Sequence, residues 1–86
     1  MFQKELVVHN ETGLHARPAS DLSNLCQQYE SEITIISGEM EINPKSIISI
    51  LSGGIYKGAK VLLQVEGIDE EAAGNAIAEF IENLKE

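Results

Sequence analysis

Residues 60–84 read KVLLQVEGIDEEAAGNAIAEFIENL and contain two regular patterns in direct succession. Val61, Leu63 and Val65 alternate with other residues, which is the period of a strand with one shared face. Gly67 then predicts a turn, after which apolar residues recur three and four positions apart, as on one face of a helix. This apolar stripe consists of Ala72, Ala73, Ala76, Ile77, Phe80, Ile81 and Leu84. The segment therefore predicts a strand followed by an amphipathic helix that needs a sheet to pack against.

The residues before Lys60 repeat both patterns. Alternating or β-branched residues predict three further strands, and apolar residues at helical spacing predict a first helix. Pro18 suits the first turn of that helix, and Ser46 suits the N-cap of a second, short helix that Gly53-Gly54 ends. The predicted strands cover residues 2–8, 33–36, 40–42 and 60–66, and the predicted helices cover 16–28, 47–51 and 70–84, with Asp69 as the cap of the last.

The predicted order of elements is β-α-β-β-α-β-α. The simplest arrangement that buries three apolar helix stripes is one four-stranded, mostly antiparallel sheet with all three helices on one face. The other face would be open to water, which antiparallel sheets permit. The chain has 86 residues and shows no repeat, low-complexity segment or linker, so a single α+β domain over residues 1–86 is expected.

Composition and charge exclude several classes of protein. Apolar residues make up 43 % of the chain, too many for a disordered protein, and no apolar run is long enough to cross a bilayer. Six basic and fourteen acidic residues give a formal net charge of −8, which argues against nucleic acid as a partner. Residues 1–5 do not resemble a secretory signal, so we expect a cytoplasmic protein that is not inserted into a membrane.

The distribution of charge and the single cysteine add two expectations. Residues 66–86 hold seven acidic residues and one basic residue, which is typical of a solvated helix face. Cys26 is the only cysteine, so neither a disulfide nor a thiolate metal site can form, and the thiol is expected in the core. We therefore expect no metal and no cofactor.

A candidate reactive site lies in the stretch Gly13-Leu14-His15-Ala16-Arg17-Pro18-Ala19. Gly13 allows an unusual backbone conformation before the helix, and Pro18 marks the first helical turn. His15 is therefore expected at or beside a helix N-terminus, where unpaired N–H groups and the positive end of the dipole can receive a phosphate. Arg17 adds a planar fork of hydrogen-bond donors.

A neutral imidazole in this position is a competent nucleophile, and the negative charge of a phosphorylated His15 would be stabilised by the helix N-terminus. These residues alone predict an anion-binding helix start with a titratable histidine. A surface histidine or a weak helix cap would produce the same local pattern, so both interpretations stay open at this point.

Two stretches of the chain together resemble the HPr family of phosphocarriers. The first is residues 13–19. The second runs from Lys45-Ser46-Ile47-Ile48 to Ser52-Gly53-Gly54-Ile55 and is followed by the turn Lys57-Gly58-Ala59. The resemblance covers essentially the whole chain. It implies an open-faced β-sandwich and a phosphoryl carrier that is not an enzyme in the turnover sense.

The resemblance also implies partners and site residues. Enzyme I would phosphorylate the δ nitrogen of His15, Arg17 would steady the phosphate, and an enzyme IIA domain serving sugar uptake would receive it. Besides capping a helix, Ser46 would be a regulatory site for an HPr kinase/phosphorylase. The docking surface would consist of Ala16, Ala19, Ser20, Ile47, Ile48 and Leu51.

Alternatives stay open for the function. The chain could be a regulatory HPr-like protein in which phosphorylated Ser46 binds a transcriptional regulator while His15 is inert. It could also be a carrier for nitrogen control or for dihydroxyacetone phosphorylation. His9 is expected to face solvent, and Tyr29 and Tyr56 are expected to be packing groups.

Overall fold

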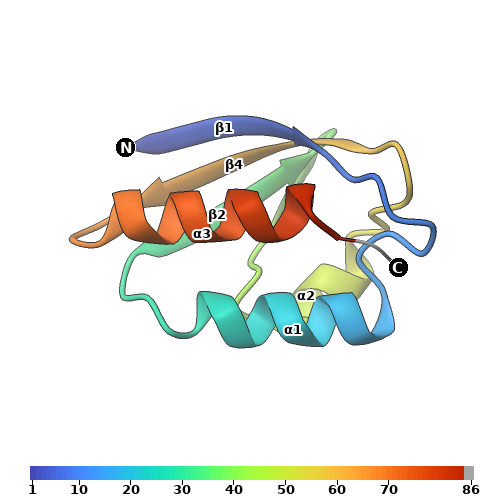
Figure 1. The fold of residues 1–86 in the computed structure, drawn as a ribbon, viewed down its shortest axis with the longest axis horizontal. Helices are drawn as coiled ribbons and strands as arrows, with labels where there is room; N and C mark the ends of the chain where they lie inside the picture. The colour runs from blue at the N-terminus through green and yellow to red at the C-terminus, as the bar shows by residue number, and fades with distance from the viewer. Residues whose placement is uncertain (85–86) are drawn as a thin grey trace.

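The computed structural model describes residues 1–84 and contains the secondary-structure elements in the predicted order (Figure 1). The strands are β1 (Phe2–Val7), β2 (Glu32–Ser37), β3 (Met40–Ile42) and β4 (Lys60–Glu66). The helices are α1 (Ala16–Cys26), α2 (Ile47–Ser52) and α3 (Glu70–Glu82). No helix within the described residues is long and apolar enough to cross a membrane.

The four strands form one sheet in the order β1-β4-β2-β3, and all neighbours are antiparallel. In β4, Val61, Leu63 and Val65 are buried, whereas Leu62 and Gln64 between them are half-buried. This alternation arises because the helices cover one face of the sheet and leave the other face toward water (Figure 1). The predicted four-stranded, mostly antiparallel sheet with three helices on one face is confirmed.

Helix α3 packs on one side of the sheet, against the edge strand β1 and its neighbour β4. Its backbone approaches the sheet at Gly74, where a Cβ atom would collide with the ring of Phe2. Gly74 and Ala78 are therefore buried, together with Ile77, and the opposite edge of the helix is turned outward. The prediction that Ala72 belongs to the buried stripe is wrong, because this rotation leaves it exposed.

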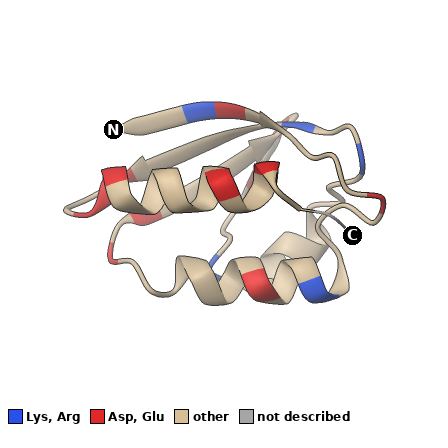
Figure 2. Ribbon diagram, viewed as in Figure 1, with Lys and Arg blue, Asp and Glu red and all other residues tan. Residues whose placement is uncertain are grey.

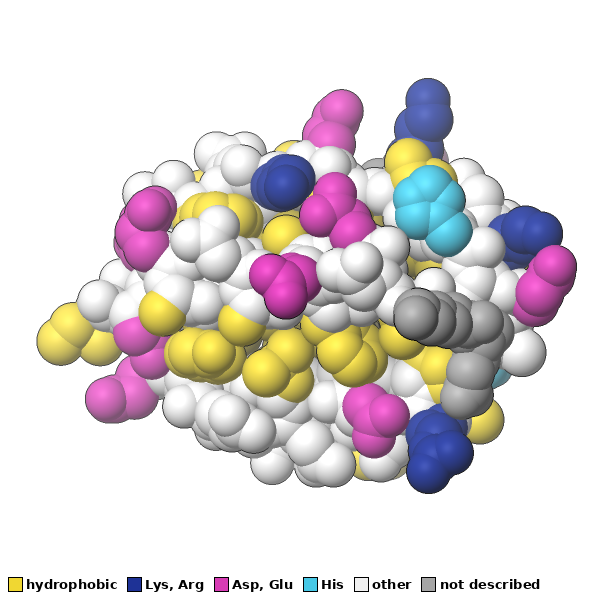
Figure 3. Space-filling model, in the orientation of Figure 1, with side chains coloured by type: hydrophobic (Ala, Val, Ile, Leu, Met, Phe, Trp, Pro, Cys, Tyr) yellow, Lys and Arg dark blue, Asp and Glu magenta, His cyan; other side chains and the backbone are white. Residues whose placement is uncertain are grey.

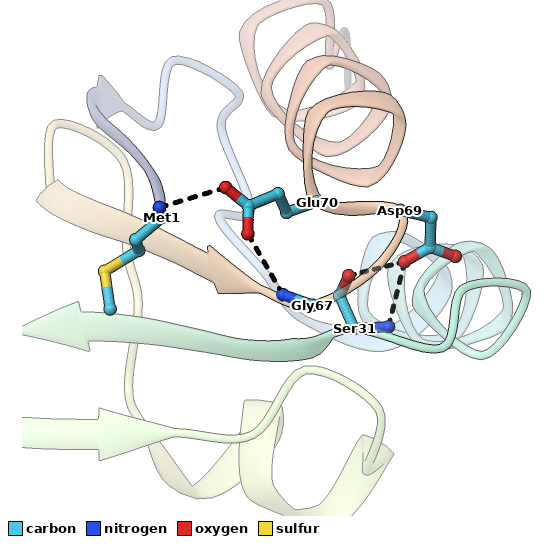
Figure 4. Close-up of polar contacts among 5 residues, drawn as sticks. All are labelled: Met1, Ser31, Gly67, Asp69 and Glu70. Carbon is cyan, nitrogen blue, oxygen red and sulfur yellow. Dashed lines mark hydrogen bonds and ion pairs between the residues drawn. The ribbon is translucent and has the colours of Figure 1, made fainter.

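The carboxylate of Asp69 connects the start of α3 to the loop before β2 (Figure 4). Asp69 occupies the N-cap position of α3, but its side chain makes no hydrogen bond to the helix. It accepts hydrogen bonds from the Ser31 hydroxyl and from the backbone N–H groups of Glu30 and Ser31, the latter two at 2.9 Å. These hydrogen bonds lower the pKa of Asp69, and the bond from the Ser31 hydroxyl has the largest effect.

The carboxylate of Glu70 holds the chain N-terminus in a similar way (Figure 4). It lies 3.0 Å from the amino group of Met1 and accepts a hydrogen bond from the Gly67 N–H at 3.1 Å. The pairing raises the pKa of the Met1 amino group and lowers that of Glu70. The other acidic residues of α3, Glu71, Glu79 and Glu82, are exposed, which agrees with the predicted solvated face. Figure 2 shows acidic positions in red along α3.

Helix α1 packs through Leu22 and Cys26, both completely buried. Burial raises the pKa of the Cys26 thiol to about 12, so it remains protonated at neutral pH, and the prediction of a core cysteine is confirmed. The helix ends at Cys26, two residues before the predicted end.

Lys45 joins α1 to the start of α2. Its carbonyl oxygen accepts hydrogen bonds from the Ser23 hydroxyl and from the Gln27 amide, each at 3.0 Å. Its ammonium group donates to the carbonyl oxygen of Tyr29 at 2.8 Å. These bonds fix the position of α2 relative to α1, which carries the candidate site.

Candidate functional site

The loop before α1 is shaped by Asn10, which is almost completely buried. The Asn10 side-chain amide donates a hydrogen bond to the Gly13 carbonyl oxygen at 2.7 Å, and the Gly13 N–H donates to the Asn10 carbonyl oxygen at 3.2 Å. This closed turn places Gly13 in the left-handed region, with a φ of 64°. The prediction of an unusual backbone at Gly13 is confirmed.

The same loop lies directly against the segment that follows α2. The Leu14 N–H donates to the Ile55 carbonyl oxygen at 3.0 Å. A Cβ atom on Gly13 would collide with that oxygen and would lie 2.8 Å from the Cα of Tyr56. Leu14 and Ile55 are both completely buried, so the two segments form one packed unit that carries His15 beside Tyr56.

His15 is the N-cap residue of α1 and has an extended backbone, with φ −119° and ψ 161°. Its side chain makes no capping hydrogen bond and is half-buried. The N–H groups of Ala16 and Arg17 follow at the helix start, where backbone donors have no intrahelical partner. An anion on the imidazole would therefore lie at the positive end of the α1 dipole.

Ala16 has a φ of 48°, and it is the only residue other than glycine with a positive φ among those described. This conformation costs an alanine roughly 1–2 kcal/mol and persists only where the surrounding structure enforces it. Here the packed loop on one side and Pro18, buried in the first turn, on the other provide that constraint. Strained backbone next to a chemically competent side chain is typical of a functional site.

Arg17 is exposed in the first turn of α1 and makes no ion pair with any residue between 1 and 84. It lines a groove of about 580 Å³ between α1 and α3, together with the carboxylate-bearing Asp21 and Glu79. Figure 3 shows hydrophobic side chains along the line where these two helices face each other. The guanidinium is thus available to an incoming anion, although two carboxylates share its groove.

Helix α2 carries the apolar part of the expected docking surface. The exposed fractions are 40 % for Ile47, 77 % for Ile48 and 39 % for Leu51, whereas Ile50 on the opposite side is buried. A short helix held by one buried residue and anchored at Lys45 leaves these three side chains accessible. An exposed apolar patch of this kind is typical of a protein-binding surface.

The α1 residues that were expected on the same surface differ in their burial. Ala16 is exposed and Ser20 is half-buried. The expectation that Ala19 lines the surface is wrong, because its side chain is completely buried in the core. The reason is geometric: Ala19 lies one turn before Leu22 and Ser23, which are also buried, and it shares their inward face.

Ser46 occupies the predicted N-cap position of α2. Its hydroxyl oxygen accepts a hydrogen bond from the Ser49 N–H at 3.2 Å, so the capping role is confirmed. The side chain is half-buried and stands directly before Ile47 and Ile48. A charge added at Ser46 would therefore lie at the edge of the exposed apolar surface.

Tyr56 is a site residue that the sequence analysis missed. It was expected to pack, yet it is 64 % exposed, and its ring centroid lies 5.7 Å from that of His15 with 31° between the ring planes. Its place in a turn after Gly53-Gly54 is the signal that could have indicated an exposed ring. Tyr29 does pack against the core, and His9 is exposed, as predicted.

Among residues 1–84, no three His, Cys, Asp or Glu side chains gather into a group that could hold a metal ion. The candidate site offers an imidazole, a guanidinium and helix N–H groups, a set that suits a phosphoryl group or another small anion.

Comparison with known proteins gives the family. Residues 2–83 match the family model described as the PTS HPr component phosphorylation site. The chain belongs to the HPr family. The phosphocarrier protein HPr of Borreliella burgdorferi is 40 % identical over 86 residues, which is all of both chains. That of Mycoplasma pneumoniae is 39 % identical over 83 residues, covering 95 % of this chain and 94 % of the relative.

Solved HPr structures have the same fold. The crystal structure of HPr from Thermoanaerobacter tengcongensis superposes with a TM-score of 0.92 at 38 % identity, covering 95 % of this chain and 92 % of that one. Membership of the HPr family makes the protein a phosphocarrier of the phosphotransferase system, not a catalytic enzyme, and implies partner proteins within that system.

Proposed function

We propose that His15 is the phosphoryl acceptor of this HPr protein, charged by enzyme I and discharged by enzyme IIA domains in the cytoplasm during sugar uptake. The position of His15 carries the proposal. It is the N-cap residue of an eleven-residue helix, its side chain makes no capping hydrogen bond, and strained backbone follows it at Ala16. The resemblance to the family motif over residues 13–19 points to the same residue.

The transfer is a displacement at phosphorus. A ring nitrogen of neutral His15, the δ nitrogen by family resemblance, attacks the phosphorus of the donor phosphohistidine as the nitrogen–phosphorus bond of the donor breaks. The donor imidazole leaves with the electron pair of that bond and takes up one proton at a ring nitrogen, which makes it neutral. His15 gives up the proton of its other ring nitrogen on phosphorylation, so the exchange is balanced in protons. The same exchange in reverse roles passes the phosphoryl group to an enzyme IIA domain.

The surroundings of His15 would favour this exchange through charge. The N–H groups at the start of α1 and the guanidinium of Arg17 are donors that can turn toward the phosphoryl oxygens. Because the site is open to solvent, these groups would stabilise the phosphorylated form without trapping it. A carrier needs that balance, since it must release the group to the next protein.

Partner proteins would dock on the exposed apolar surface of α2 beside this site. Ile47, Ile48 and Leu51 supply apolar contact area, and Ala16 and Ser20 lie at the exposed start of α1. Ser46 would act as a switch: phosphorylation by an HPr kinase/phosphorylase would place negative charge at the edge of the docking surface and weaken binding to enzyme I. The phosphorylated form could instead be recognised by a transcriptional regulator.

The decisive experiment is phosphoryl transfer from labelled phosphoenolpyruvate through a bacterial enzyme I. Wild type and His9→Ala should both take up label, lost in acid but stable in base. His15→Ala should remain unlabelled. His9 is a matched control because it is an exposed histidine in the loop before α1. Equal labelling of His15→Ala, with an unfolding transition like that of the wild type, would refute the assignment of His15.

If active enzyme I proteins leave the wild type unlabelled, the regulatory alternative through Ser46 is favoured. Labelling that succeeds but is discharged only by enzymes of nitrogen control or of dihydroxyacetone phosphorylation would favour the other carrier function. The first outcome is read from the absence of label on the wild type, and the second from the acceptor that removes the label.

A further inference from the structure

Tyr56 is an aromatic side chain that the core does not use. It lies between α2 and β4, with 64 % of its surface exposed. Its ring lies over Gly54: a Cβ atom at Gly54 would be 3.6 Å from Cε2 and 3.7 Å from the hydroxyl oxygen of Tyr56. Burial in the core therefore does not explain why this aromatic ring lies over a glycine and beside a reactive side chain.

The backbone around Tyr56 sets the position of this ring. The Tyr56 carbonyl oxygen accepts a hydrogen bond from the Ala59 N–H at 3.0 Å, and the Gly58 N–H donates to the Val8 carbonyl oxygen at 2.7 Å. On the other side, Ile55 holds Leu14 by the hydrogen bond at 3.0 Å. The two ends of the turn are thus fixed to Val8, directly after β1, and to the loop that carries His15.

The separation of the His15 and Tyr56 rings, 5.7 Å with a tilt of 31°, lies within the range of favourable aromatic pairs. The imidazole has no capping hydrogen bond. Among the described residues, Tyr56 is the one whose ring pairs with it. Without this contact, a half-exposed histidine could rotate about both side-chain bonds.

We propose that Tyr56 is a positioning residue for phosphoryl transfer: its ring packs against the imidazole of His15 and holds it in one orientation at the start of α1. The proposal rests on the proposed role of His15 as acceptor. A phosphoryl group is transferred faster when the imidazole is already held in the productive orientation, because this orientation does not have to be found at each encounter with a partner.

The chemistry of Tyr56 defines which variants test this role. The Tyr56 hydroxyl makes no hydrogen bond to any residue within 1–84, so the face of the ring is the part in use. Tyr56→Phe should therefore behave as the wild type. Tyr56→Leu keeps an apolar side chain but removes the ring, and Tyr56→Ala removes both.

The first measurement is NMR of the unphosphorylated protein. The ring protons of His15 should have shifts displaced by the Tyr56 ring in the wild type and in Tyr56→Phe, and the displacement should be lost in the Leu and Ala variants. Side-chain couplings of His15 should show one dominant χ1 rotamer in the first pair and averaging in the second pair. A purely structural role of Tyr56 would change the ring-current shifts but would leave the χ1 rotamer populations of His15 unchanged.

The second measurement is the rate of transfer from phosphorylated enzyme I. The loss of an aromatic pair predicts a decrease of roughly two- to tenfold in kcat for the Leu and Ala variants, with little change in KM. Tyr56→Phe should restore the wild-type rate. The same decrease should occur with an enzyme IIA acceptor, because orientation of His15 matters for both transfers.

Unchanged His15 signals in Tyr56→Ala, or equal kcat in all four proteins, would overturn the positioning role. An increase in KM for enzyme I alone would also overturn it and would make Tyr56 a docking contact. These failures leave the assignment of His15 intact, because the wild type is labelled in each of them. A wild type that takes no label would instead refute the acceptor role of His15, and the positioning role with it.

Discussion

Gly13 lies directly against the carbonyl oxygen of Ile55, with no room for a Cβ atom between them. This contact joins the loop before α1 to the segment after α2, and it explains how two stretches far apart in the sequence form one site. The hydrogen bond from Leu14 to the same oxygen reinforces it. The position of His15 thus depends on a glycine two residues before it.

Gly13→Ala is predicted to destabilise the protein and to displace the site. The new methyl group would meet Ile55 and Tyr56, and the φ of 64° would be strained in addition. We expect a loss of about 3 kcal/mol in the free energy of unfolding, measured with urea, and altered NMR shifts at His15 and Tyr56. Gly38→Ala is the matched control, because Gly38 has a φ of 62° with no atom within 4 Å of the added Cβ.

Gly38→Ala should cost only about 1 kcal/mol, the price of the backbone conformation alone. Equal losses for the two variants would show that the contact with Ile55 is unimportant.

Asp69→Asn is predicted to lower stability at neutral pH and to remove part of its pH dependence. The pKa of Asp69 is lower in the folded state than its ordinary value of 3.8, chiefly because of the Ser31 hydroxyl. Its contribution is therefore complete above that ordinary value and is lost as the pH falls through the lower, folded-state pKa. Urea unfolding across the acid range should show the wild-type and Asp69→Asn curves converging below about pH 4.

The control for Asp69 is Asp21→Asn, which changes an exposed carboxylate on α1. Its unfolding curve should stay near that of the wild type at all pH values. Parallel curves for Asp69→Asn and the wild type, with a constant gap down to the lowest pH, would contradict the role of the carboxylate charge.

The order of the elements could be predicted because it depends on local patterns. The alternation in β4 and the helical spacing in α3 are visible in any short window of the sequence. The start of α1 and the cap of α2 also follow from local residues, namely Pro18 in a first helical turn and Ser46 as an N-cap. The helix start that carries His15 was therefore identified without knowledge of the fold.

The errors concern features set by contacts between distant residues. Ala19 and Ala72 are small and fit either side of a helix, so only the packing of α1 and α3 decides that one is buried and the other exposed. Asp69 occupies the N-cap position of α3, but its carboxylate accepts a hydrogen bond from the Ser31 N–H and none from the helix. Tyr56 meets His15 only because Ile55 and Leu14 are hydrogen-bonded, which no local pattern reveals.

Ile48→Ser is predicted to impair docking without affecting the fold. Because 77 % of the side chain is exposed, the free energy of unfolding should change by about 0.5 kcal/mol or less. If the surface of α2 receives enzyme I, KM for enzyme I should rise about fivefold or more, the effect of losing one apolar contact. The measurement is transfer of label from phosphorylated enzyme I at varied carrier concentration.

Ile68→Ser is the matched control for this surface. Ile68 is 89 % exposed in the turn between β4 and α3, at the end of the molecule away from the start of α1 (Figure 1). It should leave both stability and KM unchanged. Equal KM values for the wild type and both variants would place the docking surface elsewhere.

Ser46 can be tested for its two roles separately. Ser46→Ala removes the hydroxyl that accepts from the Ser49 N–H, so α2 should lose its cap and the protein about 1 kcal/mol of stability. Ser46→Asp keeps an acceptor at the N-cap and should retain stability. Its negative charge, however, lies before Ile47 and Ile48, where it would reproduce part of the effect of a phosphate.

Transfer from enzyme I should therefore be slow for Ser46→Asp and close to normal for Ser46→Ala, the reverse of their order in stability. Urea unfolding gives the order of the variants in stability, and initial rates of labelling give their order in transfer, both on the same protein samples. This crossed result separates charge from capping, because a variant that merely loosened α2 would lose stability and transfer together. Normal transfer by Ser46→Asp at low ionic strength, where electrostatic effects are strongest, would exclude Ser46 as a charge-operated switch of docking.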